Sequence, residues 1–183
     1  MYKLFICVVM KEMHVRLMEK EDFTEIYSLI EKNRDRLLMY FPKTSAGIKD
    51  LEAAKKFARH KVRQALEREQ YYFVVALKSD AEIIGMVMVK NIDWTIPKGE
   101  LAYFIDENYE GIGITSNAVK RVVEYCFKEL EMEKLYIKFN PENVGSKKVA
   151  IKNGFEKEGF LKREFRTGLG ELTDVERYGL LRR

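Results

Sequence analysis

The chain has 183 residues, of which 46% are hydrophobic and 34% charged, and a formal net charge of +4. This length fits one domain, or one domain with an extension. Lysine and arginine are interleaved with acidic residues along the chain, which indicates a mixed, solvated surface and argues against a nucleic-acid-binding patch. The two cysteines and two histidines lack the spacing of a disulfide framework or a metal site, so neither is expected.

The N-terminal residues resemble neither a signal peptide nor a membrane span. The apolar run near the start is shorter than a signal peptide needs, and no run in the chain approaches the ~18–20 apolar residues of a membrane helix. The sequence therefore predicts a cytoplasmic protein without a membrane partner. Met10 and Met13 are alternative starts, so residues 1–12 are expected to be an extension and residues 13–183 a single domain.

The first half of the chain predicts one strand, three helices and a hairpin. A strand is expected at residues 14–18, a helix at 19–32 and a short helix at 33–41, stopped by Pro42 and followed by a polar loop at 43–47. Residues 48–69 have the pattern of a long amphipathic helix. Strands at 71–77 and 82–90, joined by a turn at Ser79-Asp80, should pair as a hairpin with a bulge at Gly85.

The second half alternates strands with helices. A strand at residues 100–105 leads into a glycine turn and a helix, and an alternating strand follows at 134–139. Asn143 fits the N-cap of a helix at 144–153, and Gly154 fits the position that ends it. Two final strands are expected at 155–166 and 172–180. This order predicts an α+β (mixed α/β) fold with a mostly antiparallel sheet of about six or seven strands.

The glycine turn is the stretch with the clearest chemical potential. It has the sequence Glu110-Gly111-Ile112-Gly113-Ile114-Thr115-Ser116. Glycines at a helix start let the backbone approach a ligand, and the first N–H groups of the helix point outward at the positive end of its dipole. Such a turn can bind phosphate. The nucleotide-binding glycine motifs do not fit, and a bare Gly-x-Gly also occurs in ordinary turns, so its context decides.

The context resembles the GNAT acetyltransferase superfamily, and within it the RimJ/RimL type that acetylates ribosomal-protein alanine or serine. Five motifs occur in the order of that branch, between about residues 15 and 181. They are Val15-Arg16-Leu17, the strand from Gly99 to Phe104, the turn from Glu110 to Ala118, the helix from Asn143 to Phe155 and the stretch from Asp174 to Leu181. The resemblance implies the GNAT fold, with helices on both faces of the sheet and a splay between its fourth and fifth strands.

The resemblance also implies acetyl-CoA as the cofactor. The pantetheine arm would pair with the open strand edge, and the pyrophosphate would bind the N–H groups of the turn. The cofactor-binding candidates are Phe104, Ile105, Glu110, Gly111, Ile112, Gly113, Ile114, Thr115, Ser116, Asn143, Ser146 and Lys147. Two of them depart from the superfamily motif, because Glu110 replaces Gln or Arg and Thr115 replaces Gly or Ala. Asn143 could instead serve only as a cap, and Lys147 could belong to a solvated charge pair.

Two side chains are candidates for catalysis. A neutral amine must attack the thioester, so a base helps, and Glu100 lies in the strand that leads to the site. Its alternative is a solvated or salt-bridged strand residue. Many superfamily members place a tyrosine on the fourth helix to protonate the leaving thiolate, but that position is Ala150 here. Ser146, one turn earlier on the same face, is the substitute, or else a first-turn serine that bonds its own helix.

Three functions remain open at this point. The first is acetylation of the N-terminal amine of a ribosomal or other protein, and the second is acetylation of a small amine such as a polyamine, amino acid or drug. The third is a non-catalytic acyl-CoA-binding or nucleic-acid-binding module. An acidic cleft would favour a polyamine and an open groove a peptide. The segment Met39-Tyr40-Phe41-Pro42-Lys43 replaces the Trp-Leu-Pro-Trp of the branch on the acceptor side. A monomer or a homodimer is expected.

Overall fold

The computed structural model describes residues 13–77 and 82–183. The expected extension at residues 1–12 and the expected turn at Ser79-Asp80 lie outside the described residues. The described part begins directly with the first strand, which starts at Met13.

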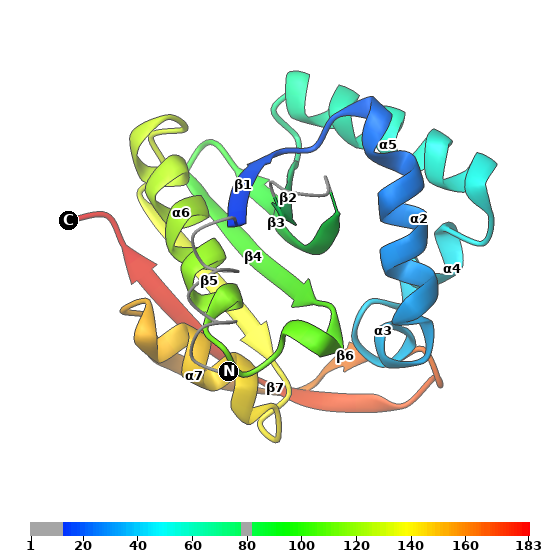
Figure 1. Ribbon diagram of the computed structural model, residues 1–183. Helices are drawn as coiled ribbons and strands as arrows, with labels where there is room; N and C mark the ends of the chain where they lie inside the picture. Colours follow the sequence, from blue (N-terminus) through cyan, green and yellow to red (C-terminus); the bar gives the residue numbers. More distant parts are fainter. Residues whose placement is uncertain (1–12, 78–81) are drawn as a thin grey trace.

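The described strands form one seven-stranded sheet with the order β1-β2-β3-β4-β5-β7-β6 (Figure 1). All neighbouring strands are antiparallel except β4 and β5, which are parallel because the chain crosses over through a helix between them. The expectation of a mostly antiparallel sheet is thus confirmed. The strands are β1 (Met13–Leu17), β2 (Tyr71–Leu77), β3 (Ile83–Asp93), β4 (Lys98–Ile105), β5 (Lys134–Phe139), β6 (Glu156–Arg166) and β7 (Leu172–Leu181).

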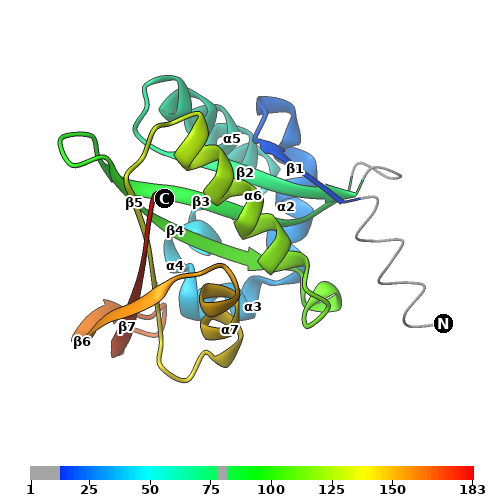
Figure 2. The ribbon, with the colours of Figure 1, turned by 90° about the vertical axis from the view of Figure 1, so that its left-hand side faces the viewer.

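Helices cover both faces of this sheet, as the family resemblance implies (Figure 2). One face packs against α2 (Phe23–Lys32), α3 (Arg34–Tyr40), α4 (Pro42–Gly47) and α5 (Leu51–Leu66). The other face packs against α6 (Ile114–Lys128) and α7 (Val144–Lys152). Alternate strand residues feed two separate apolar cores, since successive side chains point to opposite faces. Buried residues such as Ile26 and Ile48 belong to the first core, and Ile114 and Ile137 to the second.

The predicted polar loop at residues 43–47 is wrong, because α4 occupies Pro42–Gly47. Pro42 starts this helix at its first position, where a missing N–H costs nothing and a fixed φ is already helical. The helix predicted over residues 48–69 is shorter, because Asp50 caps it by accepting a hydrogen bond from the Ala53 N–H at 2.7 Å. The helix predicted from residue 19 opens with a 3-10 turn at Lys20–Asp22.

Two glycine predictions are confirmed. The β2–β3 register shifts beside Gly85, because Val75 pairs with Gly85 and the next residue pairs with Ile83. A Cβ on Gly85 would lie 2.8 Å from the carbonyl oxygen of Phe104, so glycine permits close approach of β3 and β4. Gly154 ends α7 with a φ of +80°.

Candidate active site

The parallel pair β4–β5 opens partway along its length. The residues in register run from Lys98 and Lys134 to Leu101 and Ile137, and pairing stops there although β4 continues to Ile105. Beyond Leu101, one edge of β4 therefore has no described strand beside it. This is the splay that the resemblance implies, and it leaves backbone groups available for an extended ligand.

The alternation along β4 identifies which backbone groups face this open edge. The Asp106 N–H donates to the Ile84 carbonyl of β3 at 2.8 Å, so the neighbouring residue, Ile105, presents its N–H and carbonyl to the opposite side. Phe104 pairs with Met86, and its ring lies in the core beside Phe41, with 5.2 Å between the ring centroids. Of the two predicted edge residues, Ile105 has its backbone N–H and carbonyl on the open side. Phe104 directs its backbone N–H and carbonyl toward β3 instead.

The glycine turn has the backbone geometry of an anion cradle. Gly111 has a φ of +73° and Gly113 a φ of +90°, in the left-handed region that side chains other than glycine avoid. A Cβ at Gly111 would meet none of the described atoms within 4 Å. Gly113 stands at the N-cap of α6, and no side chain of residues 13–77 or 82–183 caps this helix end.

Hydrogen bonding within α6 begins at Asn117, whose backbone N–H donates to the Gly113 carbonyl oxygen at 3.1 Å. The N–H groups of Ile114, Thr115 and Ser116 therefore have no acceptor within the helix. They lie at the positive end of the dipole of a 15-residue helix. These residues fit a pyrophosphate, which needs several convergent donors.

Lysine adds positive charge at the same place. The Lys152 Nζ would lie 4.0 Å from a Cβ built on Gly113, so its ammonium is beside the turn. Lys152 comes from the end of α7, which also contacts the start of α6, since the Asn153 Nδ2 donates to the Ser116 Oγ at 3.1 Å. The sequence prediction missed Lys152, although it stands in the α7 motif that carries the resemblance.

The start of α7 faces β4. Asn143 caps it, as predicted, because its Oδ1 accepts a hydrogen bond from the Ser146 N–H at 2.9 Å. The Tyr103 hydroxyl of β4 donates to the Ser146 carbonyl oxygen at 3.2 Å. Burial raises the pKa of Tyr103 well above its ordinary value, against a smaller lowering by this hydrogen bond, so its hydroxyl keeps its proton at neutral pH. Tyr103 and Ser146 thus place two hydroxyl-bearing residues where β4 meets α7.

Lys147 and Glu100 are both ion-paired. The Lys147 Nζ lies 3.4 Å from a carboxylate oxygen of Glu176. Glu100 is 5% exposed and has the ammonium groups of Lys90 at 3.3 Å and Lys138 at 3.5 Å. It also accepts a hydrogen bond from the Asn91 Nδ2 at 2.9 Å. These contacts correspond to the ion-paired alternative for Glu100.

Arg36 of α3 reaches into the predicted site, and no sequence pattern indicates this. Its Nη2 donates to the Ile105 carbonyl oxygen at 2.6 Å, and its Nη1 pairs with the Glu110 carboxylate. Both partners are predicted cofactor-binding residues. They stand 69 and 74 residues away in the chain, so only the tertiary fold brings Arg36 to them.

Cys126, the one cysteine in the described part of the chain, is not placed for covalent catalysis. Its side chain is fully buried in α6, and burial raises the pKa of its thiol to about 12. A buried neutral thiol is a poor nucleophile. This agrees with direct transfer from the thioester to an amine.

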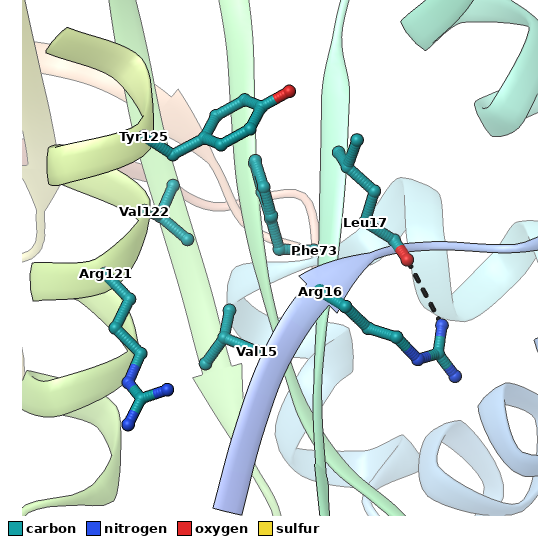
Figure 3. A pocket seen from close by; sticks show the side chains of 7 residues that line it. All are labelled: Val15, Arg16, Leu17, Phe73, Arg121, Val122 and Tyr125. Atoms are coloured by element: carbon teal, nitrogen blue, oxygen red, sulfur yellow. Dashed lines mark hydrogen bonds between the residues drawn. The ribbon is translucent and has the colours of Figure 1, made fainter. Parts of the chain in front are cut away.

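A separate pocket of about 260 Å³ lies between β1 and α6, away from the glycine turn (Figure 3). Its lining has no carboxylate to accept a proton, and none of the predicted site residues belongs to it. It is lined by Val15, Arg16, Leu17, Phe73, Arg121, Val122 and Tyr125. The Arg16 guanidinium turns away to bond the Leu17 carbonyl oxygen at 3.1 Å. The glycine turn and the open β4 edge are therefore the better candidate site.

In the described residues no helix has the length and apolarity to cross a membrane.

Comparisons with known proteins agree with this geometry. The acetyltransferase (GNAT) domain matches residues 12–156. The Bacillus subtilis protein named "Probable N-acetyltransferase YjcK" is 30% identical over 154 residues, covering 84% of this chain and 85% of that protein. The Escherichia coli spermidine N(1)-acetyltransferase is 28% identical over 151 residues, covering 82% of this chain and 76% of the relative.

The solved structures include a ribosomal-protein-S5-alanine acetyltransferase from Vibrio fischeri. It superposes with a TM-score of 0.87 at 29% identity, covering 93% of each chain. Its likeness extends over the sheet and the helices on both faces. The family match spans the open β4 edge, the glycine turn and α7, where the candidate site lies. The chain therefore belongs to the GNAT family and is an N-acetyltransferase that uses acetyl-CoA.

Proposed function

We propose that this enzyme acetylates the N-terminal amine of a protein, of the kind that ribosomal-protein acetyltransferases modify. The charge on one face of the sheet is the observation that carries the proposal. The acceptor would approach the side of β4 and β5 that faces α3 and α4, because the cofactor turn and α7 belong to the other side. Register places Lys90, Glu100, Lys138 and Arg177 on this acceptor face.

The carboxylates of the acceptor face are matched by cations. Glu100 pairs with Lys90 and Lys138, and Lys138 also pairs with Glu164 at 3.2 Å. Glu158 pairs with Lys134 and with Arg177. Burial lowers the pKa of Lys138, but the carboxylates of Glu100 and Glu164 together raise it by more, so this ammonium stays charged. A polyamine needs surplus negative charge, which these pairs do not offer, whereas a peptide amine does not need it.

The proposed cofactor contacts follow from the same geometry. Gly111 to Ser116 would hold the pyrophosphate through backbone N–H groups, with Lys152 contributing charge. The Ile105 N–H would bind the thioester oxygen at the end of the pantetheine arm and stabilise the oxyanion, an effect worth about 3 kcal/mol in other enzymes. Acetyl-CoA supplies the thioester that the acceptor amine attacks. Ser146 would donate a hydrogen bond to the departing sulfur, and Asn143 would hold Ser146 in place through its cap.

The acceptor is tested by comparing rates of CoA release with peptides and with spermidine. Peptides that begin with alanine or serine should give a kcat/KM at least about tenfold above that of spermidine, since discrimination of this size is within reach of a binding cleft. The matched control is the same peptide with its N-terminus already acetylated, which should be inert. A higher kcat/KM for spermidine would make polyamine acetylation, the activity of one relative, the better assignment.

The roles of Glu100 and Ser146 are tested separately. If Glu100 accepts the proton through a water, Glu100→Gln should lower the kcat of the folded enzyme by about 100-fold or more. If it serves only its ion pairs, the variant should instead lower the melting temperature and leave the kcat of the folded enzyme unchanged. Ser146→Ala should lower kcat without raising the KM for acetyl-CoA, and unchanged kinetics would rule the hydroxyl out.

A further inference from the structure

The position of Glu110 raises an electrostatic problem. Its carboxylate comes immediately before Gly111, at the edge of the turn that would bind a pyrophosphate, and its side chain is 55% exposed. A negative charge there repels the negative charge of the phosphates. A compensating cation must stand nearby for the turn to keep its affinity.

Arg36 is that cation. Its guanidinium bonds the Glu110 carboxylate and the Ile105 carbonyl oxygen at once, and its side chain is 35% exposed. A planar guanidinium presents donors in a fixed fork and stays charged at all working pH values, so it can hold both acceptors in one geometry. The two contacts join the edge of the anion turn to the open end of β4.

The helix that carries Arg36 is itself fixed to this segment. At the start of α3, the Asn33 Nδ2 donates to the Asp106 Oδ2 at 3.2 Å, and the Asn33 Oδ1 accepts from the Glu107 N–H at 3.3 Å. Asn33 is 4% exposed and Asp106 3% exposed, so these bonds are shielded from water. Arg36, one turn along α3, is therefore held close to Glu110.

We propose that Arg36 is a positioning residue of the acetyl-CoA site, which neutralises Glu110 and fixes the Ile105 carbonyl so that the turn accepts the pyrophosphate. The inference rests on the proposed assignment of the glycine turn to the cofactor. Arg36 acts through its charge, because without Arg36 the edge of the turn carries an uncompensated carboxylate. With both charges removed, the edge is neutral again.

The test is calorimetric titration with acetyl-CoA at low and high salt. Arg36→Met should weaken binding about 10-fold at low ionic strength, the size expected for one unscreened charge several ångströms from a phosphate. The double variant Arg36→Met/Glu110→Gln should recover most of the lost affinity. The difference between Arg36→Met and wild type should shrink as salt rises, because half-exposed charges are screened over about 10 Å.

Controls separate charge from structure. Arg59→Met removes the same charge from the exposed face of α5, on the other side of the sheet from the turn, and should bind acetyl-CoA like wild type. The KM for S-acetylpantetheine, which has no pyrophosphate, should change less in Arg36→Met than the KM for acetyl-CoA, because only acetyl-CoA carries the phosphates that Glu110 repels. Melting curves of each variant show whether it is folded.

The outcomes separate the assignment of acetyl-CoA to the glycine turn from the role of Arg36. Failure of the wild type to bind acetyl-CoA would overturn the cofactor assignment itself. Normal binding by the wild type together with equal binding by Arg36→Met would overturn only the role of Arg36. Weak binding that Glu110→Gln does not restore would also overturn it, because charge compensation requires that rescue.

Discussion

Tryptophan in place of Gly113 should weaken acetyl-CoA binding by at least about 100-fold, to below detection by calorimetry. Gly113 has a φ of +90°, where a side chain costs roughly 1–2 kcal/mol. An indole there would also project over the N–H groups of Ile114 to Ser116 and displace the Lys152 ammonium. The pyrophosphate would lose several hydrogen bonds to charged oxygen atoms, each worth about 1.5–3 kcal/mol.

The matched control is Gly170→Trp. Gly170 has a φ of +87° in the turn between β6 and β7, and a Cβ there meets no atom within 4 Å. It carries similar backbone strain without blocking the glycine turn, so its affinity for acetyl-CoA should equal that of the wild type. An unchanged affinity in a folded Gly113→Trp variant would remove the glycine turn from the cofactor site.

Valine in place of Gly168 should lower kcat/KM for the acceptor without weakening the binding of acetyl-CoA. The Gly168 N–H donates to the Leu38 carbonyl oxygen at 3.1 Å, which joins the β6–β7 hairpin to α3. A Cβ on Gly168 would lie 2.2 Å from that oxygen, so the hairpin and α3 must separate. Because misplacement by about 1 Å can cost 100-fold, kcat/KM for the acceptor peptide should fall by about 10- to 100-fold.

Acetyl-CoA affinity should stay at the wild-type value in Gly168→Val, because the bonds of Asn33 to Asp106 and Glu107 hold the start of α3, and with it Arg36, beside the turn. Gly159→Val serves as the control on the same hairpin, because a Cβ at Gly159 meets no atom within 4 Å. Unaltered acceptor kinetics in Gly168→Val would show that the contact between hairpin and α3 does not shape the acceptor site.

The parts of the fold that depend on local patterns could be predicted from the sequence. Alternation of apolar residues gave β5 its observed bounds, and the cap and glycine signals gave α7 its observed start and the conformation of Gly154. The unpaired N–H groups at the start of α6 were also predictable, because they follow from glycines at a helix start. Pro42 misled the prediction, since proline can either stop a helix or begin one.

The contacts across the fold could not be predicted. Nothing near Arg36 indicates that it will meet Ile105 and Glu110, because its neighbours on α3 specify only a helix. The same holds for the partners of Glu100, whose lysines come from β3 and β5. Lys152 could have been predicted, since it belongs to the helix motif from Asn143 to Phe155 and its helical position places it near the turn.

The place of β7 has a consequence for synthesis of the enzyme on the ribosome. This strand comes last among the described strands in the chain but lies inside the sheet, between β5 and β6. Until β7 has left the exit tunnel, β5 pairs with β4 alone, over a short stretch, and β6 has no partner strand, because β7 is the strand that β6 pairs with in the described sheet. Nascent chains that lack β7 should therefore have no acetyltransferase activity.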